Sequence, residues 1–185
     1  MTSGTFLPVA LVLLCSSTLC SLGCDLTQGL LEDFSLLNQM SPFSLGPCWK
    51  DRTNFNFPKE ATEGSQLQRE NATVIVHEML QQIFTIFSLS ATPAAWNQTQ
   101  LMQLLSGLDQ QLEQLERCLG QDVEWEEPSL GSENPRLALK SYFQGIRITN
   151  YLKSKEYSSC AWKRVQVEIR KNFFFLFKLT ECLKN

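Results

Sequence analysis

Apolar residues recur at intervals of three and four along most of this 185-residue chain, which is the spacing of amphipathic helices. The clearest stripe alternates steps of four and three from Leu101 to Leu119, and such a helix needs partner helices to cover it. Weaker stripes of the same period predict four further helices, which lie before Ser41-Pro42, near residues 66–89, from Asn134-Pro135 onward and after Cys160. Helical spacing prevails over the alternation expected of strands, so the pattern predicts an all-α fold.

The first two predicted helices are separated by a long connection from Ser41 to Ser65, which contains several glycines and prolines. At a maximum of about 3.3 to 3.6 Å per residue, this connection is long enough to run the length of a helical bundle. It therefore allows the first two helices to lie parallel. Five helices with one early crossover fit a bundle of the up-up-down-down type better than one with short connections throughout.

The last predicted helix has two different faces. At about 100° per residue, one face is apolar and is expected in the core; it carries Ala161, Trp162, Ile169, Leu176, Leu179 and Leu183. The opposite face combines cations with two apolar side chains, namely Lys163, Arg170, Lys171 and Lys178 with Val167 and Phe174. The charges alone would favour a solvated face, whereas an apolar pair within a basic surround is typical of a protein-binding surface.

Residues 1–23 have the pattern of a secretory signal peptide, with an apolar run from Phe6 to Cys15 followed by small residues up to Gly23. The run is too short to span a bilayer, but the segment lacks Lys and Arg, so a membrane anchor stays open as an alternative. Cleavage after Gly23 would make Cys24 the first residue. Residues 24–185 would then form one secreted domain without membrane insertion.

Five of the seven cysteines lie in residues 24–185, and they are widely spaced. Zinc sites and redox motifs use closely spaced pairs, so disulfides are the better interpretation in a secreted chain. Five cysteines cannot all pair within the chain, and the spacing does not say which is left over. Two sequences, Asn71-Ala72-Thr73 and Asn97-Gln98-Thr99, are candidate glycosylation sites.

The sequence gives little support for a catalytic function. His77 is the only histidine, and Gln81 stands where the zinc-protease motif HExxH requires its second histidine. No Gly-rich phosphate loop or Gly-x-Ser-x-Gly elbow is present, and a net charge of −3 does not favour a nucleic-acid partner. We therefore expect a protein that is not an enzyme and uses no cofactor or metal. A metal hydrolase built on His77 and Glu78 is a competing hypothesis, which absence of zinc in the purified protein would eliminate.

Several motifs, in order along the chain, resemble those of type I interferons. They are Cys24-Asp25-Leu26, Lys50-Asp51-Arg52, Phe57-Pro58, Val76-His77-Glu78-Met79, Gln81-Gln82-Ile83-Phe84, Ala94-Ala95-Trp96, Tyr142-Phe143-Gln144 and Cys160-Ala161-Trp162. Their combination is far more specific than any one of them. Within the alpha, omega and delta-like group, Asn97 after Trp96 resembles the omega branch.

The resemblance implies a helical cytokine, secreted as a monomer, that bridges the two chains of the interferon alpha/beta receptor. Bridging would trigger Janus kinase signalling and an antiviral, antiproliferative response. A different helical cytokine with another receptor is the alternative. The resemblance also implies the disulfides Cys24–Cys118 and Cys48–Cys160, which leaves Cys182 unpaired.

Two receptor surfaces follow from the same resemblance. The high-affinity receptor chain is expected on the long early connection and the outer face of the last helix, at Trp49, Arg52, Gln166, Val167, Arg170, Lys171 and Phe174. The low-affinity chain is expected on the other side of the bundle, at His77, Glu78, Gln81, Phe84, Thr85 and Lys140. Taken alone, His77 would more simply be an ordinary helix-surface residue.

Overall fold

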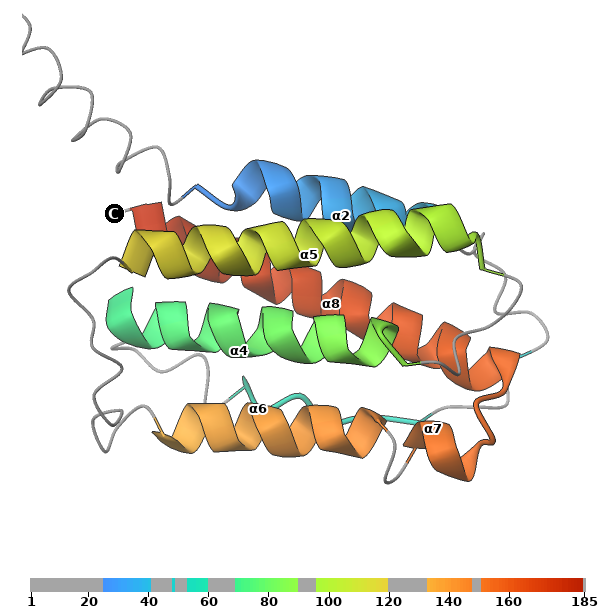
Figure 1. Ribbon diagram of the computed structural model, residues 1–185. Coiled ribbons are helices and arrows are strands. Elements are labelled where there is room, and N and C mark those ends of the chain that lie inside the picture. The colour runs from blue at the N-terminus through green and yellow to red at the C-terminus, as the bar shows by residue number, and fades with distance from the viewer. Residues whose placement is uncertain are drawn as a thin grey trace, which may run out of the picture.

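The computed structural model describes residues 25–40, 48, 53–59, 69–89, 96–119, 133–147 and 151–184. Its helices are α2 (Thr27–Gln39), α4 (Arg69–Phe87), α5 (Gln98–Leu119), α6 (Glu133–Ile146), α7 (Tyr151–Ser154) and α8 (Ser159–Lys184) (Figure 1). These described ranges contain no strand, and the all-α prediction is confirmed. None of the helices is both long and apolar enough to cross a bilayer within this part of the chain.

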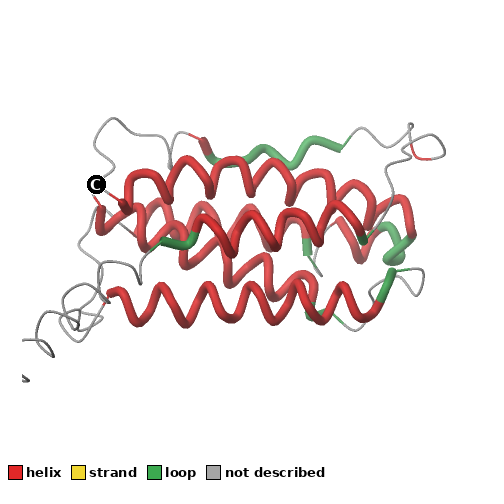
Figure 2. Tube along the Cα trace, turned by 90° about the horizontal axis from the view of Figure 1, so that it is seen from above, coloured by secondary structure: helices red, strands yellow, loops and turns green. Residues whose placement is uncertain are grey.

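The helices α2, α4, α5 and α8 form a bundle, and α6 lies alongside α4 (Figures 1 and 2). In Figure 1, α2 and α4 run in one direction whereas α5 and α8 run in the other, which confirms the up-up-down-down arrangement. The central helix α4 contacts α5, α6 and α8, and α2 contacts α5 and α8. The chain must therefore cross the bundle between α2 and α4, as the long connection predicts.

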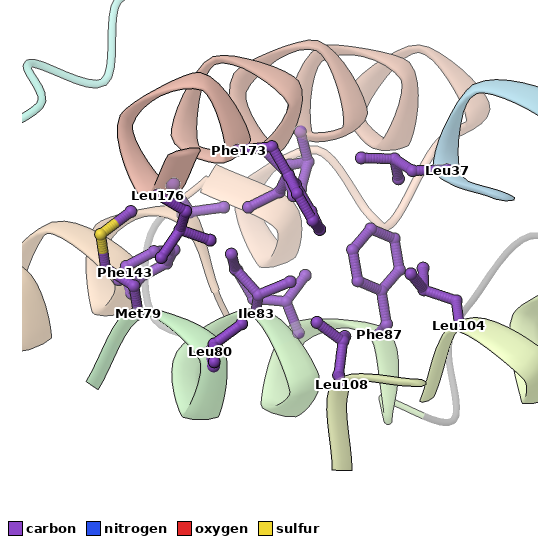
Figure 3. Packing of buried hydrophobic residues seen from close by; sticks show 14 of the residues in the cluster. Leu37, Met79, Leu80, Ile83, Phe87, Leu104, Leu108, Phe143, Phe173 and Leu176 are labelled. Carbon is purple, nitrogen blue, oxygen red and sulfur yellow. The ribbon is translucent and has the colours of Figure 1, made fainter. Parts of the chain in front are cut away.

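The core lies where the apolar stripes of these helices meet. Figure 3 shows Phe173 and Leu176 of α8 facing Ile83 and Phe87 of α4, with side chains of α2, α5 and α6 around them. All six residues of the predicted inner face of α8 are buried. Trp162, which is fully buried, packs edge-to-face on Trp96 with ring centroids 5.2 Å apart. The inner face of the last helix is therefore confirmed.

Two glycines allow α2 and α5 to approach closely. The Gln111 side chain lies over Gly29 and the Asp33 side chain over Gly107, so a Cβ atom at either glycine would overlap them. Asp33 is buried, and its Oδ2 has no hydrogen-bond partner among the described residues. Burial raises the pKa of Asp33 to about 7, and the neighbouring charge of Glu32 adds to the increase.

Candidate functional site

A disulfide joins the long early connection to the start of α8. Cys48 and Cys160 are bonded, with their Cα atoms 5.3 Å apart and a sequence separation of 112. A second link lies nearby, because the Arg164 guanidinium donates a hydrogen bond to the Thr53 carbonyl at 2.6 Å. These two links hold the segment 53–59 against the beginning of the last helix. The disulfide is the one that the resemblance implies.

Aromatic contacts continue this attachment along segment 53–59. Phe55 packs edge-to-face on Tyr151 of α7 at 4.9 Å between ring centroids. Phe57 packs in the same way on Tyr142 of α6 at 5.2 Å and on Phe175 of α8 at 5.0 Å. Figure 2 shows the segment as a loop that runs along one side of the helices. A stretch without regular structure is thus fixed by rings from three helices.

The outer face of α8 presents the mixture of apolar and basic side chains that its sequence predicts. Phe174 is 60% exposed, Lys171 is exposed, and Val167 and Arg170 are half-buried. Partial burial lowers the pKa of the Arg170 guanidinium from its ordinary value. A large exposed ring among cations is uncommon on a surface that only faces water.

Phe174 is exposed but not isolated. Its ring packs edge-to-face on Phe34 of α2, with centroids 5.4 Å apart. Phe34 also contacts Phe173 at 5.9 Å and Phe177 at 6.0 Å, so four rings join α2 to α8. Phe34 is itself partly exposed beside Phe174. The contact could not be found without the relative placement of two helices.

Gln166 departs from the expected outward position. Its side chain is only 3% exposed, and its Nε2 donates a hydrogen bond to the Leu37 carbonyl of α2 at 2.6 Å. The physical reason is that α2 covers this sector of α8. Gln166 therefore satisfies a carbonyl near the end of α2 and positions the two helices instead of forming part of the exposed face.

The second expected surface lies on α4. His77 is half-buried, and its Nε2 lies 3.2 Å from Glu116 Oε1 of α5. Gln81 is exposed, whereas Phe84 and Thr85 are half-buried, and the Thr85 hydroxyl donates to the Gln81 carbonyl at 2.7 Å. Together these residues form a narrow, partly exposed strip along one side of α4.

Glu78 also departs from expectation, because it is fully buried between α4 and α6. Arg136 Nε lies 2.9 Å and Lys140 Nζ 4.0 Å from the same Glu78 oxygen. Gln82 Nε2 donates to the other oxygen at 2.8 Å. Glu78 thus anchors α6 to α4, and Lys140 stays half-buried at the edge of this cluster. The spacing of Arg136 and Lys140, four apart on one helix, is the signal that could have indicated a shared acidic partner.

Another buried polar cluster lies under the outer face of α8. The Tyr142 hydroxyl donates to Glu168 Oε1 at 2.9 Å and lies 3.2 Å from Asn172 Oδ1. Lys171 Nζ pairs with the other Glu168 oxygen at 2.9 Å. Burial raises the pKa of Tyr142 above its ordinary value, and the Glu168 charge raises it further. Sequence reasoning did not predict this network, because its members come from two helices.

The other predicted cysteines and surface residues fall mostly outside the described part of the chain. Trp49, Arg52 and Cys24 lie outside the described residues, as do the side chains of Cys118, Cys182 and Asn71. The Cys24–Cys118 disulfide therefore stays a prediction.

Asn97 is exposed immediately before α5. Its Oδ1 accepts hydrogen bonds from the backbone N–H groups of Thr99 at 2.9 Å and Gln100 at 3.2 Å, which caps the helix. These bonds use the oxygen of the side chain, whereas a glycan is attached to its nitrogen. Capping and glycosylation of Asn97 are thus chemically compatible.

Comparison with known proteins shows which family this sequence and fold resemble. The sequence pattern of the interferon alpha/beta domain matches residues 23–183. Human interferon omega-1 is 48% identical over 180 residues, which cover 95% of this chain and 91% of that protein. Horse interferon alpha-1 is 45% identical over 169 residues, covering 89% and 91%. The structure of zebrafish interferon 2 aligns with a TM-score of 0.67 and 21% identity, covering 79% of this chain and 93% of that one, and so shares the fold.

Proposed function

This chain belongs to the type I interferon family, in its alpha/omega branch, and from that premise we propose that it is secreted and bridges the two chains of the interferon alpha/beta receptor. Bridging would bring together the Janus kinases bound to the receptor chains. The expected result is an antiviral and antiproliferative response. The protein would contribute binding surfaces and no catalytic step, in keeping with a family of cytokines that are not enzymes.

The observation that carries this proposal is the outer face of α8 beside the tethered segment 53–59. Phe174 is exposed next to Lys171, and Val167 and Arg170 lie on the same side of the helix. Large exposed rings and arginines are the side chains that most often dominate protein interfaces. We assign the high-affinity receptor chain to this face.

Trp49 and Arg52 complete that proposed surface. Trp49 follows Cys48 directly in sequence, and Arg52 precedes Thr53. Both of these neighbours are tied to the start of α8, by the disulfide and by the Arg164 hydrogen bond. The tether thus supports a composite surface built from residues more than a hundred positions apart.

The low-affinity receptor chain is assigned to α4 and its neighbours. His77, Gln81, Phe84 and Thr85 are at least partly exposed on α4, and Lys140 adds a cation from α6. Figure 1 shows α5 passing in front of α8, with α4 beside it and α6 below α4. Surfaces on opposite sides of the bundle suit a ligand that contacts two receptor chains at once. Buried Glu78 would support this surface from beneath by holding α6 in place.

A reporter assay tests the proposal. Purified protein should induce an interferon-responsive reporter in cells of the source species, and an antibody that blocks the interferon alpha/beta receptor should abolish the signal. An unchanged response in cells that lack this receptor would instead favour a different helical cytokine receptor. An inactive protein with intact helical circular dichroism would contradict both hypotheses.

Processing is proposed from the sequence. Removal of residues 1–23 would leave Cys24 at the amino terminus, free to pair with Cys118, while Asn97 and Asn71 would carry glycans. Amino-terminal sequencing and non-reducing peptide mapping of protein secreted by mammalian cells test these points directly. A mature chain that begins elsewhere would revise the domain boundary.

A further inference from the structure

A surface groove of about 280 Å³ lies between segment 53–59 and α8. Three lysines line it, Lys59 from the segment and Lys171 and Lys178 from the helix, and all three are exposed. Among the described residues, the lining contains one carboxylate, that of Glu168, which is buried and already engaged by Lys171 and by the Tyr142 hydroxyl. The described lining therefore carries three cations and one carboxylate, although the chain as a whole has a net charge of −3.

A buried amide group in the groove lining lacks an acceptor among the described residues. Asn172 lines the groove and is 2% exposed. Its Oδ1 faces the Tyr142 hydroxyl at 3.2 Å, whereas its Nδ2 has no hydrogen-bond partner among the residues that the structure describes. Buried N–H groups without an acceptor are uncommon in native proteins. An anion oxygen that reached this N–H group would supply the missing partner.

Aromatic side chains form the rest of the described lining. Phe57 and Phe175 pack together with ring centroids 5.0 Å apart, and Phe174 stands beside them. Such rings offer apolar area on which the carbon-bound face of a sugar ring can rest. Cations and aromatic rings in one groove thus match a ligand that is anionic and also has apolar faces.

The spacing of the lysines favours a linear polyanion over a single small ion. Lys171 and Lys178 are two helical turns apart, which corresponds to about 10 Å along α8 at roughly 1.5 Å per residue. Lys59 adds a third positive charge from the segment on the other side. A chain with anionic groups at every sugar unit or two can reach several of these positions together. We propose that this groove binds a sulfated glycosaminoglycan.

A polysaccharide bound in the groove would block the surface assigned to the high-affinity receptor chain, an inference that rests on the function proposed above. Lys171 and Phe174 belong both to the groove and to the surface assigned to the high-affinity receptor chain. A polysaccharide and that receptor chain could not both contact them. Cell-surface glycosaminoglycan would therefore hold the cytokine in a form that must be released before it engages the receptor.

Binding to immobilised heparin tests the site without any receptor. The variant Lys59→Gln/Lys178→Gln removes two exposed charges from the groove and leaves the proposed receptor residues intact. Exposed ion pairs contribute modestly, so the affinity should fall about two- to thirtyfold at physiological salt. The matched control Lys153→Gln/Lys155→Gln removes two exposed charges near α7 and should change the affinity by less than about twofold.

Three results would overturn the proposal. One is no retention of the wild-type protein on heparin, and another is an equal loss of affinity in both double variants. The third is equal competition by polyglutamate of matched charge, which would show that the groove selects charge alone or an acidic peptide. In a separate arm, soluble heparin should reduce binding of wild-type protein to the receptor ectodomain. If heparin binds through Lys59 and Lys178 but leaves receptor binding unchanged, the overlap of the two sites is wrong.

Discussion

Arg136→Ala should destabilise the bundle because it removes the closest cation from a buried carboxylate. Glu78 is fully buried, and Arg136 Nε lies 2.9 Å from its Oε2. Removing one partner of a buried ion pair typically costs about 3 to 5 kcal/mol, since the other charge stays out of water. The Arg136 side chain is 31% exposed and Lys140 stays within 4.0 Å, so both features reduce the cost. We expect a loss of about 2 to 3 kcal/mol.

Urea unfolding followed by far-UV circular dichroism measures this loss. For a domain of this size, it corresponds to a fall in Tm of roughly 4 to 12 °C. Lys171→Ala is the control, because the Lys171 side chain is 64% exposed and buried Glu168 keeps its hydrogen bond from the Tyr142 hydroxyl, so the loss should be less than about 1 kcal/mol. The double variant Glu78→Gln/Arg136→Ala should lose less than the two single losses added together, since the substituted glutamine no longer carries a buried charge. Equal losses for Arg136→Ala and Lys171→Ala would refute the reasoning.

Three further changes have defined outcomes. Replacing Cys48 and Cys160 together by serine opens a link across 112 positions and should lower the free energy of unfolding by about 4 to 5 kcal/mol in the chain-entropy model, measured by urea unfolding. The pKa of Asp33 rises from 3.8 to about 7 on folding, so its neutral form stabilises the protein at low pH and this stabilisation is lost as the pH rises through 7. Through this group, the free energy of unfolding of the wild-type protein should be roughly 2 to 3 kcal/mol lower at about pH 8 than at about pH 5. Asp33→Asn should remove this pH dependence, which urea unfolding at the two pH values measures. Asn97→Gln should lower the mass of protein secreted by mammalian cells by one glycan, with Asn71→Gln reporting separately on the second sequence; an unchanged mass would contradict glycosylation at the site.

The buried and exposed faces of α8 could be predicted because they depend only on the periodicity of a single helix. Phe174 is exposed and Trp162 is buried, and both follow from about 100° per residue. Glu78 and Gln166 could not be placed in this way. Each is a polar residue that a neighbouring helix covers, α6 for Glu78 and α2 for Gln166. The pattern of one helix does not show which parts of its surface the neighbouring helices bury.

Helical periodicity also could not predict which residues far apart in sequence contact each other. Periodicity gave no reason to pair Cys48 with Cys160, and the resemblance to a known family supplied that pair. The contact of Phe34 with Phe174 and the network around Tyr142 join side chains of different helices. Their geometry depends on how the helices pack, which the sequence of each helix leaves open. Local periodicity thus predicts which residues face inward more readily than which residues meet.

The central claim is that the outer face of α8 docks the high-affinity receptor chain. Its most direct test is the affinity of Arg170→Ala/Phe174→Ala for the purified ectodomain of that chain, measured by surface plasmon resonance. Lys153→Ala/Met102→Ala is the matched control, since it removes one exposed cation and one exposed apolar side chain from other helices. The account predicts at least about a tenfold loss for the α8 variant and little change for the control. Equal affinities for wild type and both variants, with folding intact, would contradict it.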